Sequence, residues 1–201
     1  MRVDEGWWLA RIIGLKSTPI ETDAEALELF AQLAVEFSGD EQGRRVITRY
    51  PDSKAVGCSV EYEITVPRNA QIDLDTVNGA IHVQGVEGGT AVSTTSGSIE
   101  VDDAKGGVRA VTTNGRVTLE GVSGPIVAKA TNGSLSATLS PGAPVEAIEM
   151  ERVNGSVRLF VNPDAAFAVK ARTVNGSAKC ELPLTSAGEQ TRKRFEGVVG
   201  A

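Results

Sequence analysis

A three-residue motif that returns at a fixed interval constrains the fold of this chain more than any other feature. Six triplets of the form Thr/Val-Asn-Gly or Thr-Ser-Gly occur, and the first four place Gly79, Gly97, Gly115 and Gly133 in steps of 18 residues. The last two end at Gly155 and Gly176, after steps of 22 and 21 residues. A fixed period of this length is typical of stacked-repeat architectures.

The apolar residues keep the same phase as the triplets. Two positions after each marker glycine stand Ile81, Ile99, Val117, Leu135, Val157 and Ala178, and four positions after it stand Val83, Val101, Leu119, Ala137, Leu159 and Cys180. The residues between them are mostly polar. This alternation predicts a strand with one buried and one exposed face after every triplet.

Stacking equivalent residues in columns would bury the apolar face that a single repeat cannot bury alone. We therefore expect an all-β fold, a single-stranded right-handed β-helix (β-solenoid) of about six coils over residues 67–183. Asn and Gly tolerate positive φ, so each triplet can turn the backbone sharply. The expected turn column contains Asn78, Gly79, Ser96, Gly97, Asn114, Gly115, Asn132, Gly133, Asn154, Gly155, Asn175 and Gly176.

An antiparallel β-meander of hairpin repeats is the alternative fold. Asn-Gly between alternating strands is also a strong hairpin signal. In a meander Leu74 would pair with Val83 across the first turn, and Val92 with Val101 across the second. In a solenoid, Ile81, Ile99 and Val117 would instead form one continuous internal line.

The flanking segments lack the period. A capping box from Thr22 to Glu25 precedes apolar residues at helical spacing, which predicts a helix over 23–34. Strands are predicted over 45–50 and 58–66. We expect residues 1–66 to cover one end of the solenoid as a cap, and residues 184–201 to form a polar tail.

Composition narrows the function classes. Of 201 residues, 4% are aromatic, and the net charge is −6. The basic run Arg192-Lys193-Arg194 is too short to argue for nucleic-acid binding. We interpret Cys58 and Cys180 as small buried side chains, with a disulfide between them left open.

We expect no catalytic, cofactor-binding or metal-binding residues, and thus no enzyme. His82 is the one histidine, at an outward strand position. Glu100, Asp102 and Asp103 cluster near one turn, where we interpret them as solvated surface charge. With Arg116 in the next repeat, Glu100 and Asp102 would be the residues to test for glycan cleavage, the least favoured function.

Residues 59–67 and 74–88, with the recurrent Thr-Val-Asn-Gly-x-Ile/Val-x-Val unit, resemble a bacterial adhesin-like family of domains of unknown function. The resemblance implies a β-helical repeat fold and association with the cell envelope, without an established activity. We therefore expect a non-enzymatic binding or scaffold module with a protein or envelope component as partner. The alternative is a self-assembling, bactofilin-like structural polymer.

No apolar stretch is long enough to cross a bilayer as a helix. The apolar run over 7–15 is short and contains Arg11, and it lacks a basic leader and a small-residue cleavage site, so we do not expect a signal peptide there. A cytoplasmic location therefore stands beside the envelope location that the resemblance implies.

Overall fold

The computed structural model describes residues 9–18, 34–39, 44–49, 57–141, 147–160, 167–180, 186–187 and 193–199. The chain divides into two compact units, Met1–Val66 and Pro67–Ala201. Every regular element in the described ranges is a β-strand, so the all-β prediction is confirmed.

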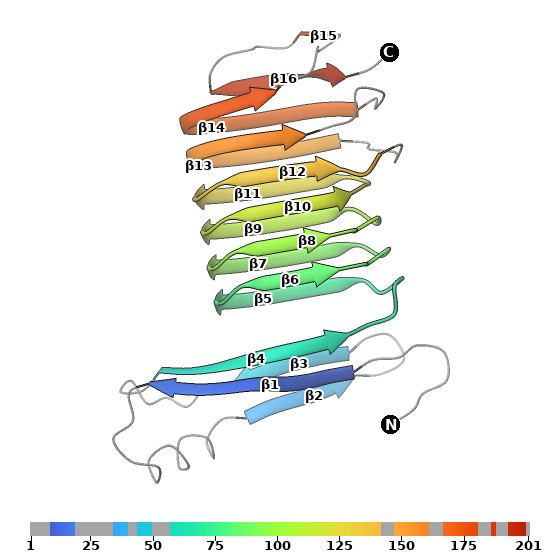
Figure 1. Ribbon diagram of the computed structural model, residues 1–201, viewed down its shortest axis with the longest axis vertical. Helices are drawn as coiled ribbons and strands as arrows, with labels where there is room; N and C mark the ends of the chain where they lie inside the picture. Colours follow the sequence, from blue (N-terminus) through green and yellow to red (C-terminus); the bar gives the residue numbers. More distant parts are fainter. Residues whose placement is uncertain are drawn as a thin grey trace. The chain divides into compact units, whose positions relative to one another are not determined.

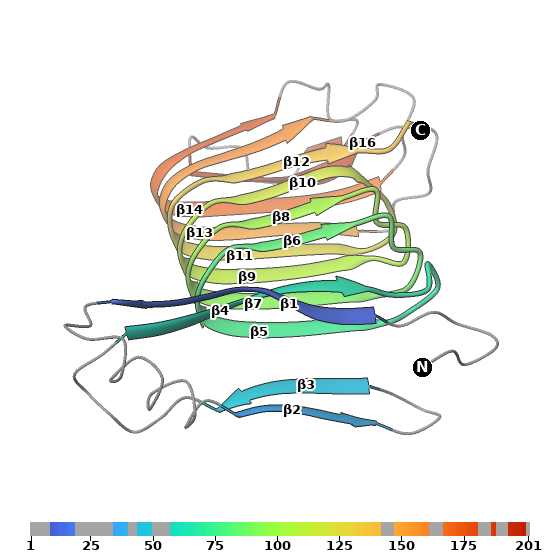
Figure 2. The same ribbon diagram turned by 60° about the horizontal axis from the view of Figure 1, so that its bottom comes forward.

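The second unit is a stack of coils, each with two strands joined at two corners (Figures 1 and 2). The first strands of successive coils are β5 (Ile72–Asn78), β7 (Thr90–Ser96), β9 (Val108–Asn114) and β11 (Ile126–Asn132). The second strands are β6 (Ile81–Gln84), β8 (Ile99–Asp102), β10 (Val117–Val122) and β12 (Leu135–Leu139). β13 (Ala147–Phe160) and β14 (Phe167–Cys180) each run through the corner and contribute to both sides.

Pairing between coils is parallel and in register. Leu74 is level with Val92, and Val83 with Val101, so neither pairs across the Asn-Gly turn as a meander would require. The meander alternative is therefore wrong, and the β-solenoid is confirmed with about five turns rather than six. The six triplets mark six Asn-Gly corners. The chain makes one full turn between each corner and the next, which gives five turns.

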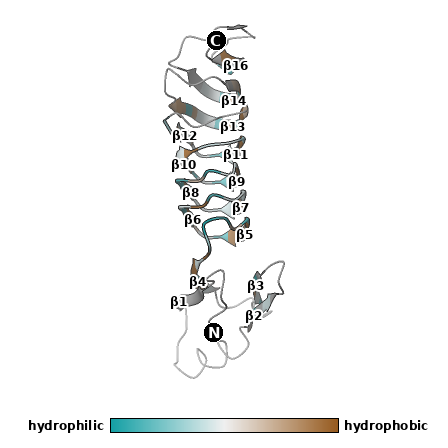
Figure 3. Ribbon diagram, turned by 90° about the vertical axis from the view of Figure 1, so that its right-hand side faces the viewer, coloured by the Kyte–Doolittle hydropathy of each residue, from teal (hydrophilic) through white to brown (hydrophobic). Residues whose placement is uncertain are grey.

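The core is a set of apolar columns between the two layers of strands, which Figure 3 shows on opposite sides of the stack. Ile99 and Val117 are 0% exposed, and the register continues their line from Ile81 to Leu135 and Val157. Small residues such as Ala110 and Ala128 are also fully buried, which keeps the layers close. Among the described residues, branched aliphatic side chains, alanine and Met150 make up the buried apolar interior.

The solenoid ends in strands where we expected a polar tail over 184–201. β16 (Arg194–Val199) pairs antiparallel with β14, and the two-residue β15 (Ser186–Ala187) pairs antiparallel with β16. Backbone groups along Phe167–Arg172 are thereby satisfied by a strand of opposite direction. This segment is part of the sheet, because an unpaired strand edge needs a partner.

The first unit contains two antiparallel pairs. β1 (Leu9–Thr18) pairs with β4 (Gly57–Thr65), and β2 (Ala34–Gly39) pairs with β3 (Arg44–Arg49). β3 and β4 confirm the strands predicted over 45–50 and 58–66, whereas β1 and β2 were not predicted. A hydrogen bond between the hydroxyls of Thr48 and Tyr62 links β3 to β4.

Three expectations stay predictions. The helix over 23–34 lies outside the described residues, apart from Ala34, where β2 begins. The right-handed winding and the capping role of residues 1–66 also stay predictions. Cys58 and Cys180 lie on β4 and β14, and their side chains lie outside the described part of the structure.

Candidate functional site

The Asn-Gly corner carries a ladder of side-chain amides. Asn132 Nδ2 donates to Asn114 Oδ1 at 2.8 Å, Asn154 Nδ2 to Asn132 Oδ1 at 2.7 Å, and Asn175 Nδ2 to Asn154 Oδ1 at 3.0 Å. Ser96 stands level with Asn114 and Asn78 but carries a hydroxyl instead of an amide. The expected turn column is thus one line of stacked residues, and its amide ladder spans the last four corners.

Glycine is required in this column because the coils approach each other closely. A Cβ placed on Gly97 would lie 1.8 Å from the carbonyl oxygen of Gly79, and one on Gly115 would lie 1.8 Å from that of Gly97. The same contact recurs at Gly133, 1.6 Å from Gly115 O. No side chain fits there without moving backbone, so the corner is a structural element that fixes the coil spacing.

A buried polar column supports the same corner from inside. Thr94, Thr112 and Thr173 are each at most 5% exposed. Their hydroxyls donate to the carbonyl oxygens of Gly79, Gly97 and Gly155, each at 3.3 Å. These bonds satisfy backbone acceptors that face the interior at the turn.

Arg152 occupies this column in the fifth coil, and sequence reasoning did not single it out. The side chain is 3% exposed, and burial lowers the pKa of its guanidinium. Nε donates to Asn154 O at 2.6 Å and Nη1 to Ser156 O at 2.9 Å, and Nη2 also bonds Asn154 O. The guanidinium therefore serves as an internal clamp on the corner, and its charge is solvated by backbone carbonyls.

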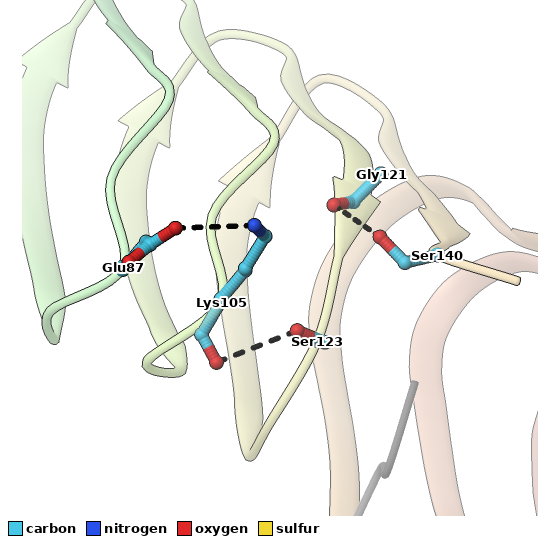
Figure 4. Close-up of polar contacts among 5 residues, drawn as sticks. All are labelled: Glu87, Lys105, Gly121, Ser123 and Ser140. Carbon is cyan, nitrogen blue, oxygen red and sulfur yellow. Dashed lines mark hydrogen bonds and ion pairs between the residues drawn. The ribbon is translucent and has the colours of Figure 1, made fainter. Parts of the chain in front are cut away.

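The opposite corner is held by different contacts (Figure 4). Lys105 Nζ lies 3.2 Å from Glu87 Oε1, and Ser123 Oγ donates to the Lys105 carbonyl at 3.4 Å. Ser140 Oγ donates to Gly121 O at 2.6 Å. The polar contacts here involve side chains of varied length, so the described part of this corner lacks the uniform amide ladder of the Asn-Gly corner.

The outward side of the β6–β8–β10–β12 layer, continued by the second half of β13, forms what we call the graded face. Its residues are His82, Gln84, Glu100, Asp102, Thr118, Glu120, Ser136, Thr138, Arg158 and Phe160. The first two coils contribute the histidine and two carboxylates, the third coil Thr118 and Glu120, the fourth coil two hydroxyls, and the fifth coil an arginine and a phenylalanine that is 49% exposed. The chemistry therefore changes along the stack while the backbone repeats.

The acidic end of the graded face brings together residues that the sequence places 18 and 20 positions apart. His82 Nδ1 lies 3.8 Å from Glu100 Oε2 and 3.8 Å from Asp102 Oδ2. Arg116 is not beside Glu100, because Val117 is level with Ile99 and Glu100 is level with Thr118. Asp103 follows in the second corner with φ of 51°, a left-handed conformation that Asp tolerates better than most residues.

The other layer carries an ion network on its outer side. Lys129 Nζ lies 2.9 Å from Glu151 Oε2 and 3.3 Å from Glu149 Oε1. The hydrogen bond from Lys129 lowers the pKa of Glu151, and the same bond raises the pKa of Lys129. All three side chains are about one-third exposed, so we interpret the network as surface charge.

Two residues of the basic run near the C-terminus, Lys193 and Arg194, line a small pocket. Arg172, Thr173, Val174, Lys193 and Arg194 line a cavity of about 250 Å³. Arg172 is level with Arg194, which forms an ion pair with Glu196 at 2.7 Å. The pocket therefore combines basic side chains from β14 and β16 that are about 20 residues apart in sequence.

Within the described ranges there is no helix of the length and hydropathy needed to span a membrane. Neither the curated proteins nor the solved structures contain a match to this chain. The family model Toastrack DUF4097, a β-solenoid-like domain of unknown function, matches residues 64–200. This match agrees with the observed coils and gives no support to an adhesin. Because it covers more than half of the sequence, the chain belongs to the Toastrack DUF4097 family.

Proposed function

We propose that this chain is a non-enzymatic binding or scaffold module of the bacterial cell envelope that presents its graded face to a partner. One observation carries the proposal: the apolar inward columns repeat one chemistry from coil to coil, whereas the graded face changes from mainly carboxylates to mainly hydroxyls and then to Arg158 and Phe160. The repeated inward residues pack against one another and stabilise the fold. The variation outside offers a partner a sequence of distinct contacts.

The spacing of the coils suits such a role. Adjacent strands lie about 4.8 Å apart, so a partner lying along the stack meets side chains from several coils at once. Extended faces of this kind are the usual binding surfaces of solenoid proteins. Arg158 and the half-exposed Phe160 are of the residue types enriched at interfaces, and we expect them to anchor the partner.

A binding role fits the graded face better than catalysis does. Glu100 and Glu120 are exposed on an open strand surface, where water solvates the carboxylates. General acid–base chemistry works best where burial or a neighbouring charge shifts the pKa of a carboxyl group toward the working pH. The envelope location rests on the resemblance of residues 59–67 and 74–88 described above.

The terminal strand weighs against the alternative of a bactofilin-like polymer. End-to-end growth would require a further coil to pair in parallel with β14. β16 instead pairs antiparallel with β14 along Phe167–Arg172. A second copy would have to displace β16 before it could extend this layer.

Site-specific photo-crosslinking tests the proposal. A photoreactive residue at Thr138 reports on the graded face, and the same residue at Thr113, an exposed threonine on β9, is the matched control. We expect one defined adduct from Thr138 in cells that naturally contain the protein, and its loss in Arg158→Glu and Phe160→Ser variants. Identical products from both positions, or none from Thr138, would contradict the proposal.

A further inference from the structure

We propose that His82, Glu100 and Asp102 form a binding site for a divalent transition-metal ion such as Zn²⁺. One imidazole nitrogen and one oxygen from each carboxylate lie within 4.8 Å of one another. His82 Nδ1 faces both carboxylates at 3.8 Å. Imidazole and carboxylate are established zinc ligands, and three protein ligands with water in the remaining positions is a common arrangement.

The sheet itself brings the three ligands together. His82 is level with Glu100 across the β6–β8 pair, and Asp102 follows Glu100 by two residues on the same face. Two residues along a strand bring side chains back to the same side, about 6.6 Å apart, so His82 can reach both carboxylates. The backbone positions are fixed by strand pairing, and only side-chain torsions need to adjust.

The distances are close to those of a bound site. With zinc–ligand bonds of about 2.1 Å and tetrahedral angles, two ligand atoms lie about 3.4 Å apart. The two separations from His82 Nδ1, both 3.8 Å, exceed this value by about 0.4 Å, and all three ligand atoms lie within 4.8 Å of one another. Rotation about the side-chain bonds of His82 and Glu100, which are both 56% exposed, is enough to close the difference.

Electrostatics also favour a cation here. Glu120 is level with Asp102 on the next strand, so carboxylates from β8 and β10 face the same side at strand spacing. Like charges directly opposite each other destabilise a sheet. Lys105, a nearby cation in the sequence, is engaged by Glu87 at the corner.

Asp102 is the least exposed of the three proposed ligands, with a side chain that is 25% exposed. Its Oδ1 atom is inaccessible to solvent and has no hydrogen-bond partner within the described structure, while Oδ2 faces His82. This carboxylate has one oxygen shielded from water without a partner, which is costly, and a metal ion bound at Oδ2 would offset part of its negative charge. The competing explanation is that the three side chains are neighbouring surface groups that bind no ion.

Calorimetric titration of the chelator-treated chain with ZnCl₂ separates these explanations. We expect saturable binding of one Zn²⁺ per chain, and a loss of about tenfold or more in affinity for His82→Ala, Glu100→Gln and Asp102→Asn. The matched control is Asp73→Asn, which removes an exposed carboxylate on β5 and should change the affinity less than about twofold. No saturable binding by the original chain, or unchanged binding by His82→Ala, would overturn the site.

Zinc also binds thiolates, so the titration is repeated with Cys58 and Cys180 replaced by serine. The single histidine provides a second readout, because only one set of imidazole NMR signals exists. Zinc should shift these signals in the original chain and in Asp73→Asn, and about tenfold or more zinc should be needed for the same shift in Asp102→Asn. Unshifted signals at saturating zinc would place the ion elsewhere and refute the proposal. Both measurements use the chain alone, so their failure would leave the proposed partner binding untouched.

Discussion

The two corners of each coil solve the same turning problem in different ways. At the Asn-Gly corner, the glycines stack so closely that a Cβ on Gly115 would lie 1.8 Å from Gly97 O. The opposite corner also has a close approach, since a Cβ on Gly106 would lie 2.4 Å from Gly88 C, but a Cβ on Gly89 would find its nearest neighbour, Gly106 O, at 3.8 Å. One corner has no room for variation, while the other has room in at least part of its turn.

The lengths of the coils reflect this difference. From the first strand to the marker glycine, every coil has the same length, as from Ile126 to Gly133 and from Ile148 to Gly155. The second corner varies: it spans 7 residues from Leu119 to Ile126 but 11 from Ala137 to Ile148. The Asn-Gly corner therefore sets the register of the stack, and the opposite corner accommodates insertions.

The two corners should differ most in how much stability the protein loses when four residues are inserted. A Gly-Ser-Gly-Ser insertion between Asn132 and Gly133 breaks the amide ladder and the glycine stack, so we expect a loss of more than about 3 kcal/mol in the free energy of unfolding. The same insertion between Gly124 and Pro125 lengthens the tolerant corner and should cost about 1 kcal/mol. Urea denaturation measures both. Equal losses would show that the corners are equivalent.

Alanine substitution tests the glycine stack directly. Gly115→Ala forces a methyl group against the backbone of the preceding coil, and we expect a loss of about 3 kcal/mol. Gly89→Ala should be neutral or stabilise slightly, because the methyl group has room and the unfolded chain loses freedom. Thermal unfolding of the pair provides the comparison. A Gly115→Ala protein as stable as Gly89→Ala would rule out the close approach.

Replacing Arg152 removes the internal clamp of the fifth corner. Arg152→Ala leaves the carbonyls of Asn154 and Ser156 without the guanidinium and opens a void, so we expect a loss of about 2 kcal/mol. Arg152→Thr introduces the residue type that stands at the equivalent positions Thr112 and Thr173, so this variant should lose less stability. Denaturation midpoints of the two variants and of the unmodified chain measure these losses in stability. A more stable Arg152→Ala protein would mean that the buried charge is a net cost.

The smallest expected effect is a gain. Ser96→Asn places an amide between Asn78 and Asn114, so the ladder could run through all six corners. We expect about 0.5–1 kcal/mol of added stability, since each new hydrogen bond is exposed to water. Ser98→Asn, outside the ladder, is the control in the same thermal assay. Equal stability of the Ser96→Asn protein and the unmodified chain would mean that the ladder contributes little.

The solenoid could be predicted from the sequence because local pattern and tertiary contact coincide in a repeat. When Ile81, Ile99 and Val117 recur at one phase, stacking them is the arrangement that buries all three. The strands in the first unit were only partly predictable. β1 contains the apolar pairs Leu9-Ala10 and Ile12-Ile13 on either side of Arg11, which hide any alternation, and its pairing with β4 has a register shift near Gly14.

The candidate metal site was not predicted for a different reason. His82, Glu100 and Asp102 look like ordinary outward residues one repeat apart, and no local motif joins them. The separation between ligand atoms depends on side-chain direction across two strands, which a period does not encode. Arg152 was missed likewise, since an arginine in an alternating strand is normally assigned to the solvent face.

The sequence by itself determined the period, the corner residues and the inward columns, because each of these follows from local backbone preference and the need to bury apolar surface. The tertiary structure alone decided that β16 turns back antiparallel on β14, that Arg152 points inward, and that one histidine meets two carboxylates. These features depend on which non-equivalent groups become neighbours in space, and a repeating pattern carries information only about equivalent ones.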